Sequence, residues 1–569
     1  MTMEMTTTYL VIIALAFYLF GIFFVSKRLE KSYFVPDPNR KTPACALRDD
    51  FDFYPANPYS LFGDHWAATA GGAPLSGGAT IAQWGWASGI LYVLPVNIFL
   101  GSVHDYATGF VMMRQRGQTA SEVAYRWITP LSGVLFTAIG YVAIVAFCAA
   151  FAKLVIAGAT STPALFIPLL LLAVIGPPFG YLLYRKGWPV WLVGVIQYVI
   201  FLIALYVGTF FPYSIPAEGW YVFLVIVGVL AACLPNWLYS EPSNFMMFLY
   251  MVTGVVLLFV GALVANLPIT DFPALVFYDA SKITVGTSQY VLTPSGWFYP
   301  GITMMVSCGA LTGMHVFWIG AYTCKRIPDE KWVRIIGYGG EVLESVGLWT
   351  AYLAMLVLPL TTYLPALKVG WTKAYGIGFA KIVGTIMPFI SAETLTLFGM
   401  WIVLVFIMST FYSGFRNMRV LGIEFVQLVT KRKITKYVTA SRWLAAIITG
   451  VIVVGLAISG GYLQIWALFP ILSTALAVFS FSIVGEWCVL HDKSPKIWWL
   501  ATFVTLFGIA LPASIYGAWW NLNSGAVVPA IVSLSAAVIT LIYVEEWLRR
   551  RRRGYTKEEK EKFLKFEEF

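Results

Sequence analysis

Fifteen apolar segments, most of them about as long as a helix needs to cross a lipid bilayer, follow one another through the 569 residues. Charged residues make up only 12% of the chain, whereas a soluble protein carries roughly 25%. The segments therefore predict an all-α polytopic membrane protein with about fifteen transmembrane helices, and they exclude a soluble protein of this size. They occupy residues 8–26, 61–84, 89–113, 131–158, 163–184, 188–211, 219–234, 243–267, 298–323, 334–360, 393–415, 440–459, 463–487, 498–517 and 526–548.

The net charge is +10, and most basic residues lie in alternate loops between the apolar segments. Lysine and arginine collect in this way in cytosolic loops, so the charge does not indicate nucleic-acid binding. With the loop 27–60 inside, the N-terminus of this cell-membrane protein lies outside and its C-terminus lies in the cytosol. The loops predicted to be cytosolic contain Lys27, Arg28, Lys31, Arg40, Lys41 and Arg48; Arg114, Arg116 and Arg126; Arg185 and Lys186; Lys325, Arg326, Lys331 and Arg334; Arg416, Arg419, Lys431, Arg432, Lys433 and Lys436; Lys493 and Lys496; and Arg549 to Arg553.

The stretch 361–392 departs from this pattern, because it belongs to a predicted outer loop and still contains Lys368, Lys373 and Lys381. If its semi-apolar part, 372–391, crossed the membrane, every later loop would be inverted. We therefore expect a re-entrant or interfacial segment there.

The two ends of the chain have distinct patterns. The first segment lacks the positive residues that precede the apolar part of a signal peptide, so we expect a retained helix. The tail 549–569 combines an arginine run with Phe563, Phe566 and Phe569 among Lys and Glu residues. This pattern is typical of an amphipathic helix that binds anionic lipid, and it fits a solvated tail equally well.

Two apolar segments, 61–84 and 298–323, contain glycines that interrupt a membrane helix, and the first also contains Pro74. An interrupted helix survives in a membrane only where protein covers it or where it lines a cavity. By the loop charges the two segments run in opposite directions, as broken helices in inverted-repeat transporters do. We therefore expect an N-terminal helix and loop at 1–60, inverted repeats at 61–267 and 298–548, and a cytosolic tail at 549–569.

The breaks supply candidate substrate contacts, because half-helix N-termini and unwound backbone bind carboxylates. Close helix packing through small residues is the alternative role for the glycines. Gln83 is a further candidate, and so is Lys153, a cation that either attracts a carboxylate or extends to the outer surface. The residues expected around one cavity at mid-membrane are Gly71, Gly72, Ser76, Gly309 and Thr312.

Ionisable groups inside apolar segments are costly to bury and are therefore candidates for function. Histidine titrates at about pH 6.5, and a neighbouring carboxylate moves that value through the physiological range. We expect six such groups to take up and release a coupling proton; the alternative is a static hydrogen-bonded cluster. A metal site is less favoured, because no HExxH-like spacing is present. The six groups are Asp64, His65, His104, Asp105, His315 and Glu344, with Glu341 nearer the cytosolic interface.

Long motifs occur in a fixed order between about residues 35 and 430: Arg40-Lys41-Thr42-Pro43-Ala44, Tyr54-Pro55-Ala56-Asn57, Leu61 to Ala68, Ala82-Gln83-Trp84-Gly85, Gly101 to Tyr106, Cys308 to His315, Ile336 to Gly340 and Glu344-Ser345. Through them the chain resembles the carbon starvation protein A family of inner-membrane transporters. The resemblance implies a proton-coupled secondary transporter of peptides or pyruvate with the inverted five-helix repeats of the APC/LeuT-like superfamily. A lysine at the place of Lys153 also resembles one in the family.

The chain departs from the family pattern at four places. Asp64-His65 stands where the family usually has two histidines, and Gly72-Ala73 stands where it often has Ala-Gly. Pro242-Ser243-Asn244-Phe245 replaces Pro-Arg-Asp-Tyr, and Tyr412 to Arg416 replaces Asp-Thr-Ala-Thr-Arg. These departures leave the implied mechanism in place and the substrate open.

Together these features favour a secondary active transporter, not an enzyme, that imports peptides or small carboxylates such as pyruvate with protons. The expected mechanism is alternating access around the two broken helices, with no cofactor, and the expected partners are the substrate, protons and membrane lipids. A membrane-embedded metal-dependent enzyme would need a nucleophile–base group or a metal motif, and neither is evident. An ion channel would favour a small symmetric subunit, and no GxxxxGK[ST] loop indicates ATP as the energy source.

Overall fold

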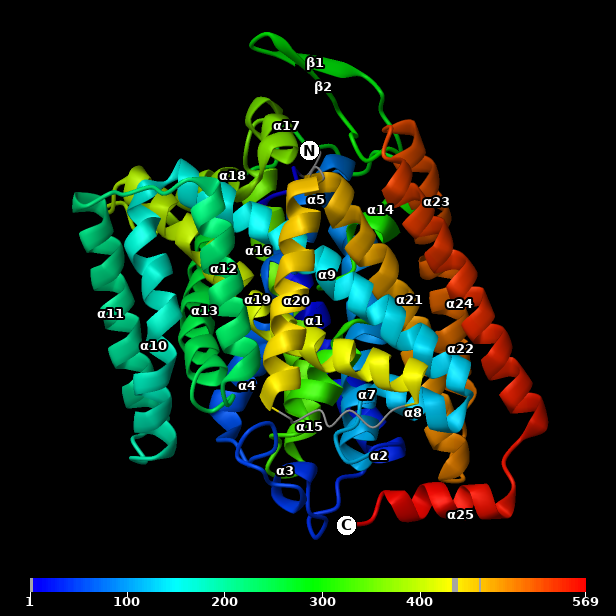
Figure 1. The fold of residues 1–569 in the computed structure, drawn as a ribbon. Helices are drawn as coiled ribbons and strands as arrows, with labels where there is room; N and C mark the ends of the chain where they lie inside the picture. Colours follow the sequence, from blue (N-terminus) through cyan, green and yellow to red (C-terminus); the bar gives the residue numbers. More distant parts are fainter. Residues whose placement is uncertain (1–3, 432–438, 460–461) are drawn as a thin grey trace.

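The computed structural model describes residues 4–431, 439–459 and 462–569, and its regular structure is almost entirely helical (Figure 1). Eleven helices within these ranges are long and apolar enough to cross a membrane. They are α1 with η1 and α2 (Thr7–Ser32), η3 with α6, η4 and α7 (Gly89–Arg114), α9 (Pro130–Ser161), η5 with α10 (Pro163–Tyr184), α11 (Val190–Phe210), α13 (Ser240–Ala265), α19 (Ala392–Thr430), α20 (Thr439–Ser459), α21 (Tyr462–Leu490), α22 with η8 and α23 (Lys496–Asn523), and α24 (Val527–Arg553).

The remaining elements are shorter. The helices are α3 (Pro43–Ala46), α4 (Pro58–Ala70), α5 (Gly72–Ile81), η2 (Ala82–Trp84), α8 (Ala120–Trp127), α12 (Ala217–Cys233), α14 (Phe298–Met305), η6 (Phe317–Thr323), α15 (Trp332–Arg334), η7 (Ile335–Gly339), α16 (Gly340–Leu356), α17 (Leu360–Val369), α18 (Thr372–Val383) and α25 (Lys557–Phe566). Strands β1 (Lys282–Val285) and β2 (Ser288–Val291) form an antiparallel hairpin in which Lys282 pairs with Val291.

Each of the fifteen predicted segments falls on one or more of these helices. The four segments that are not among the eleven long helices are α12, the stretch from α15 to α16, and the two interrupted segments. The number of membrane crossings stays a prediction.

The cytosolic loop predicted after residue 415 needs a correction. Helix α19 continues to Thr430, so Arg416 and Arg419 lie inside a helix, and both are buried. Arg326, which we placed in another cytosolic loop, is also buried. The loop-charge rule places every arginine in solvent, because it takes no account of partners. These three arginines are buried because each one lies beside a buried carboxylate. The positions Arg432, Lys433 and Lys436 lie outside the described residues.

The stretch 361–392 forms two short helices, α17 and α18. Helix α18 has 12 residues, so it is about 18 Å long, which is well short of the roughly 30 Å hydrocarbon layer. Helix α19 then begins at Ala392. A helix of this length is too short to cross the membrane by itself; a re-entrant or interfacial position for this stretch stays a prediction.

Most of the long helices run side by side, and α25 lies across one end of the bundle (Figure 1). The β1–β2 hairpin and α17 lie at the opposite end. The N-terminus lies at the hairpin end and the C-terminus at the α25 end (Figure 1). The two termini therefore lie at opposite ends of the bundle; which end faces the cytosol stays a prediction.

The interrupted segments lie against buried helices and not against lipid. Helix α5 packs on α16 and α19, and α4 packs on α13 and α16. The apolar part of α21 is completely buried, because α9 covers one side and α22 to α24 cover another. Irregular backbone in a membrane requires such a position.

The tail helix α25 begins with a capping box formed by Thr556 and Glu559. Its phenylalanines contact residues of the chain: Phe563 packs on Trp127, and the Arg126 guanidinium lies over the Phe566 ring. The tail is therefore amphipathic, as predicted, and this part of its apolar surface is covered by protein. Binding of the tail to anionic lipid stays a prediction.

Candidate functional site

The first interrupted segment is a helix broken at a single residue. Helix α4 starts after Asn57, whose side chain caps it, and α5 starts at Gly72. Between them Gly71 has a φ of +37°, which favours glycine. A Cβ on Gly71 would lie 1.8 Å from Thr410 Oγ1. Backbone conformation and space therefore both place the break at this glycine.

Hydroxyl groups of α19 pair with the carbonyl groups at the end of α4. Ser409 Oγ donates to Ala67 O at 2.6 Å, and Ser413 Oγ donates to Ala68 O at 3.2 Å. The Trp318 indole N–H in turn donates to Ser413 Oγ at 2.7 Å. Protein groups thus satisfy the backbone that the break frees, as burial in a membrane demands.

The second interrupted segment is unwound between residues 306 and 314, where the chain forms turns. Gly309 has a φ of +78°, and its N–H donates to Glu344 Oε1 of α16 at 2.9 Å. Ser307 Oγ donates to Leu311 O at 2.8 Å. A carboxylate from a neighbouring helix therefore holds the unwound backbone.

The two breaks lie side by side. A Cβ on Gly309 would come within 3.4 Å of Pro74 Cβ, and a Cβ on Gly77 would come within 3.5 Å of the Val306 methyl groups. Gly309 therefore lies beside the start of α5, the part of the helix that carries Gly72 and Ser76.

The predicted hydroxyl contacts have different environments. Ser76 Oγ donates to Gly72 O at 3.0 Å, which is an ordinary bond within the helix. The Thr312 hydroxyl is buried and has no hydrogen-bond partner. A common substrate cavity around these residues stays a prediction.

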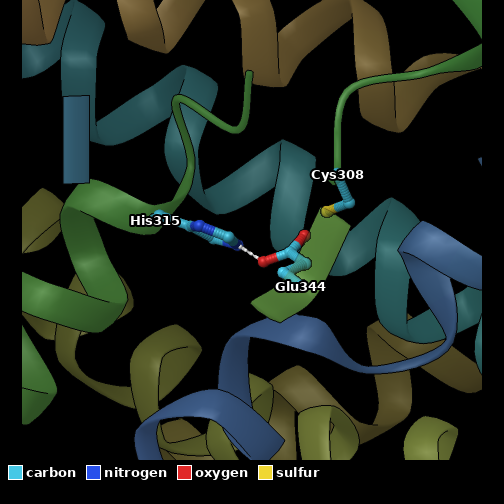
Figure 2. A group of neighbouring side chains, drawn as sticks. All are labelled: Cys308, His315 and Glu344. Atoms are coloured by element: carbon cyan, nitrogen blue, oxygen red, sulfur yellow. Dashed lines mark ion pairs between the residues drawn. The ribbon is translucent and has the colours of Figure 1, made fainter. Parts of the chain in front are cut away.

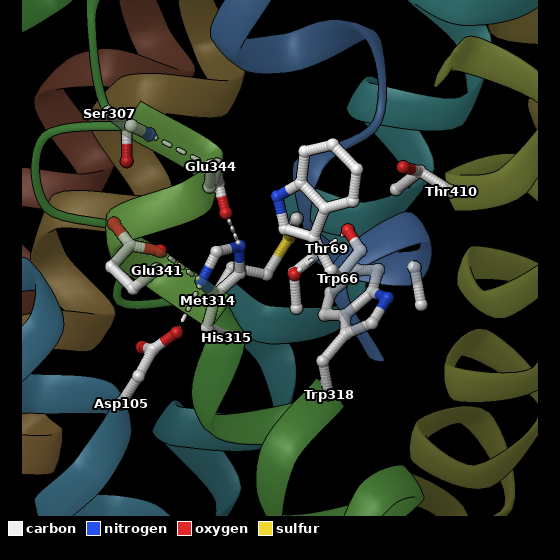
Figure 3. A network of polar contacts seen from close by, with 12 residues as sticks. Trp66, Thr69, Asp105, Ser307, Met314, His315, Trp318, Glu341, Glu344 and Thr410 are labelled. Atoms are coloured by element: carbon white, nitrogen blue, oxygen red, sulfur yellow. Dashed lines mark hydrogen bonds and ion pairs between the residues drawn. The ribbon is translucent and has the colours of Figure 1, made fainter. Parts of the chain in front are cut away.

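His315 follows the unwound stretch and lies among three carboxylates (Figure 3). Its Nδ1 is 2.8 Å from Asp105 Oδ2 and 3.0 Å from Glu341 Oε2. Its Nε2 is 3.2 Å from Glu344 Oε2. The four side chains are at most 2% exposed. Burying three negative charges beside one imidazolium is costly, so this cluster is suited to holding protons.

The cluster extends onto η4 and α7. Asp105 Oδ1 lies 2.8 Å from His104 Nδ1, and Glu341 Oε1 accepts a bond of 3.4 Å from the Asn97 amide. His104 Nε2 is buried without a partner. The structure therefore joins four of the predicted proton-coupling residues and adds Glu341, which lies inside the cluster and not at an interface.

Asp64 belongs to a separate group, whereas the neighbouring His65 is bonded to Thr323. Asp64 Oδ2 lies 2.6 Å from Arg326 Nη1, and Asp64 Oδ1 accepts a bond of 2.7 Å from the Asn244 amide. His65 Nδ1 lies 2.9 Å from Thr323 Oγ1. The six residues predicted to form one set therefore do not form one group: four lie in the cluster, Asp64 pairs with Arg326, and His65 is bonded to Thr323.

Glu241 completes the group around Arg326, and the sequence reading missed it. Its Oε2 lies 3.3 Å from Arg326 Nη1. Its carboxylate also accepts hydrogen bonds from Tyr54 at 2.5 Å, from Ser60 at 2.8 Å, and from Tyr184. One feature of the sequence could have indicated Glu241: it is an acidic residue directly before the motif Pro242-Ser243-Asn244-Phe245.

Two predicted substrate contacts lie elsewhere. Gln83 Nε2 donates to Ser295 Oγ at 3.0 Å and to Thr80 O at 2.8 Å, so the amide fixes a loop at the end of η2. The Lys153 ammonium donates to Ala457 O of α20 at 2.7 Å. Their roles in substrate binding stay predictions.

Within the described residues, two overlapping groups have the atoms to hold a metal ion. They are Cys308, His315 and Glu344, drawn in Figure 2, and Asp105, His315 and Glu341, each with ligand atoms within 4.8 Å of one another. Such nitrogen, sulfur and oxygen atoms suit Zn²⁺. In both groups, however, the imidazole already contacts the carboxylates directly. Proton coupling by these residues stays a prediction.

The fold and this site define a multi-pass α-helical membrane protein in which a buried histidine–carboxylate cluster is attached to two adjacent helix breaks. Residues 6–369 match the model of the family described as "Carbon starvation protein CstA". The chain belongs to this family.

Several curated relatives have names that describe transport. Peptide transporter CstA of Escherichia coli is 29% identical over 60% of this chain and 49% of its own length. Peptide transporter CstA of Bacillus subtilis is 26% identical over 90% of this chain and 89% of its own. Pyruvate/proton symporter BtsT of E. coli is 26% identical over 62% and 50%. The chain spans about half the length of the two E. coli relatives.

Two solved structures are similar to this chain over most of its length. The manganese transporter of Eremococcus coleocola covers 89% of this chain and 99% of its own, with a TM-score of 0.45 and 13% identity. A Na⁺-coupled sialic acid symporter covers 95% of this chain and 97% of its own, with a TM-score of 0.41 and 12% identity.

Proposed function

We propose that this protein is a secondary active transporter that imports peptides or small carboxylates such as pyruvate together with protons. Transport proceeds by alternating access around the two broken helices. The names of the E. coli and B. subtilis relatives support the class of substrate. One observation carries the proposal: Glu344 contacts the unwound backbone through Oε1 and His315 through Oε2.

This double contact suggests how proton and substrate binding are coupled. While Glu344 is ionised, its carboxylate occupies the Gly309 N–H with a charge-assisted hydrogen bond. A proton on Glu344 weakens that bond and frees the N–H to bind a substrate carboxylate. Binding of the proton therefore favours binding of the substrate.

The other ionisable groups around His315 set the charge of the cluster. Asp105 and His104 approach from α7, Glu341 approaches from α16, and Cys308 approaches from the unwound stretch. A proton entering the cluster can move between these groups over hydrogen-bond distances. His315 is the shared partner of all three carboxylates, so it is the proposed relay.

The second buried group supports alternating access. Asp64 belongs to α4 and Arg326 follows η6, so their ion pair joins the two interrupted segments. Opening this side of the protein requires that the two segments separate, which breaks the pair. The proposal includes the inverted repeats 61–267 and 298–548 and the orientation with the N-terminus outside and the C-terminus in the cytosol.

Uptake by proteoliposomes tests the proposed function. Labelled pyruvate and a labelled dipeptide are offered with and without an inside-alkaline pH gradient, with protein-free liposomes as the control. We expect saturable uptake of at least one of them, stimulated by the gradient and abolished by a protonophore. Uptake of neither compound would refute the proposal. Non-saturable flux would indicate a channel, and activity lost on chelation would indicate a metal-dependent protein.

A further inference from the structure

Two arginines one turn apart on α19 are buried beside a single carboxylate. The side chains of Arg416 and Arg419 are 2% exposed, and that of Asp52 is 5% exposed. The Phe51 ring lies under both guanidinium groups, with its centroid 5.6 Å and 5.7 Å from their central carbons. These residues form a buried, positively charged site.

The hydrogen-bond donors of this site are not all used. Arg416 Nη1 donates to Asp52 Oδ1 at 2.8 Å and its Nη2 donates to Ala231 O at 2.7 Å, but its Nε has no partner. Arg419 uses only Nη2, at 3.2 Å from Asp52 Oδ2, whereas its Nε and Nη1 are buried without partners. Buried donors normally find an acceptor, so an acceptor is missing here.

The charges of the site are also unbalanced. A guanidinium group is always protonated in proteins. Within the described residues, Asp52 is the one carboxylate in ion-pair distance of either arginine. Lys325 adds a further positive charge that acts on Asp52. The site therefore carries a surplus of positive charge, and an oxyanion would both balance it and accept the free N–H groups.

The arginines continue a line of positive charge from the second broken segment. Arg326, which follows η6, is close enough to Arg416 to repel it. Arg326 is fully buried, and its Nη2 also has no partner. Unpartnered guanidinium donors thus run from the end of the broken segment to α19.

We propose that Arg419, with Arg416, binds the carboxylate of the transported substrate on its way to the cytosol. A carboxylate is planar and accepts two parallel bonds from a guanidinium group, and the free Nε and Nη1 of Arg419 can supply them. The choice of a carboxylate rests on the proposed function. Inorganic phosphate and the phosphate of an anionic lipid share this chemistry and are separate arms of the test.

The first experiment measures affinity on each face of the membrane. Pyruvate transport is followed in inside-out and right-side-out vesicles that contain the full chain. For Arg419→Gln we expect the apparent KM at the cytosolic face to rise roughly tenfold, as for the loss of a charge-assisted bond. The KM at the outer face should stay the same. Arg419→Lys should give a smaller rise, because it keeps the charge and loses the two parallel bonds.

Arg185→Gln is the matched control. Arg185 is an exposed arginine in a predicted cytosolic loop, and it stacks on Trp237. Its replacement should leave KM unchanged at both faces. A KM for Arg419→Gln that equals the wild-type value at the cytosolic face would overturn the inference.

The second experiment measures binding without transport. Thermal unfolding of the purified protein is followed with acetate, with pyruvate, with the uncharged methyl ester of pyruvate, with inorganic phosphate and with phosphatidylglycerol. Acetate and pyruvate should stabilise the wild type, and this shift should shrink in Arg419→Gln; the ester should have no effect. Stabilisation by phosphate or phosphatidylglycerol alone would overturn the carboxylate assignment. Failure of all uptake would reject the proposed function, whereas a shift by acetate that depends on Arg419 would still support the site.

Discussion

At the scale of single residues, Glu344 connects the chemistry of the cluster to the shape of the backbone. One oxygen holds the Gly309 N–H at 2.9 Å and the other lies 3.2 Å from His315 Nε2. A change of charge at this one carboxylate therefore changes the hydrogen bond that holds the backbone of the break.

Replacing Glu344 by glutamine tests this link. The amide oxygen of glutamine still accepts the Gly309 bond, so the fold should hold, but no proton is taken up. A hydrogen bond to a charged group is worth about 1.5–3 kcal/mol, which corresponds to a factor of about ten to a hundred. We expect gradient-driven uptake to fall by about this factor in the variant. Exchange of substrate across the membrane should persist.

The control for this variant is Glu424→Gln. Glu424 is a buried carboxylate that contacts Thr119 and Ser121 outside the cluster. Its replacement should leave the stimulation by a pH gradient intact. Equal losses in both variants would mean that Glu344 has only a structural role.

Asp52 allows a test by pH. Burial raises the pKa of its carboxyl, but the guanidinium groups of Arg419 and Arg416 outweigh this effect and hold the pKa well below its ordinary value. Because the pKa in the unfolded chain is about 3.9, the stabilisation is fully present above that value. It is lost only as pH falls through the lower folded value.

Asp52→Asn should therefore destabilise the protein to the same extent at about pH 5 and about pH 8. Removing one partner from a buried ion pair costs about 3–5 kcal/mol, which thermal unfolding in detergent will register. A loss of stability at the higher pH that disappears at the lower one would show that this carboxyl titrates between them, contrary to the account.

At the scale of elements, the close packing of α5 on α16 places the first helix break beside the histidine–carboxylate cluster around His315. A Cβ on Gly78 would lie 2.2 Å from the Leu348 carbonyl oxygen of α16, so the two helices are in backbone contact there. One residue earlier, a Cβ on Gly77 would meet only side chains, at 3.5 Å and beyond. The two glycines therefore have different tolerance for a methyl group.

Gly78→Ala should force the helices apart and lower stability by about 1–3 kcal/mol, as overpacking does. Gly77→Ala should be nearly neutral. Thermal unfolding of the two variants side by side gives the comparison. Similar behaviour of both variants would contradict the described packing of α5 on α16.

At the scale of the whole molecule, the termini lie at opposite ends of the bundle (Figure 1), and the charge pattern predicts which end faces the cytosol. Cys45 is the exposed cysteine in the described residues, and the other five are buried. A membrane-impermeant maleimide should therefore label the wild type in inside-out vesicles and not in right-side-out vesicles. Cys45→Ser should remove the label. Labelling in right-side-out vesicles alone would invert the proposed orientation.

Much of this fold could be predicted from the sequence, because long apolar runs form helices in a membrane and glycines such as Gly71 and Gly309 mark their interruptions. The candidate site could be predicted only in part. His104, Asp105, His315 and Glu344 do meet, but the sequence pattern placed Glu341 nearer the cytosolic interface, whereas it contacts His315 inside the cluster.

Ion pairs between residues that are far apart in the chain could not be predicted from the sequence. The charge pattern assigned Arg326 and Arg416 to cytosolic loops, because it counts charges near helix ends. Such counting takes no account of Asp64 and Asp52, which lie hundreds of residues away in the chain and pair with these arginines in the interior. Lys153 illustrates the reverse case: an isolated cation in an apolar segment pairs with a backbone carbonyl of α20.

The central claim is that substrate uptake and proton uptake are one event, linked through the cluster around His315. The most direct measurement is the lumenal pH of proteoliposomes when pyruvate or a dipeptide is added outside without an imposed gradient, compared with protein-free liposomes. The account predicts that transport of the substrate acidifies the lumen in the wild type and no longer does so in Glu344→Gln. Substrate uptake by the wild type without acidification, or full acidification by the variant, would contradict it.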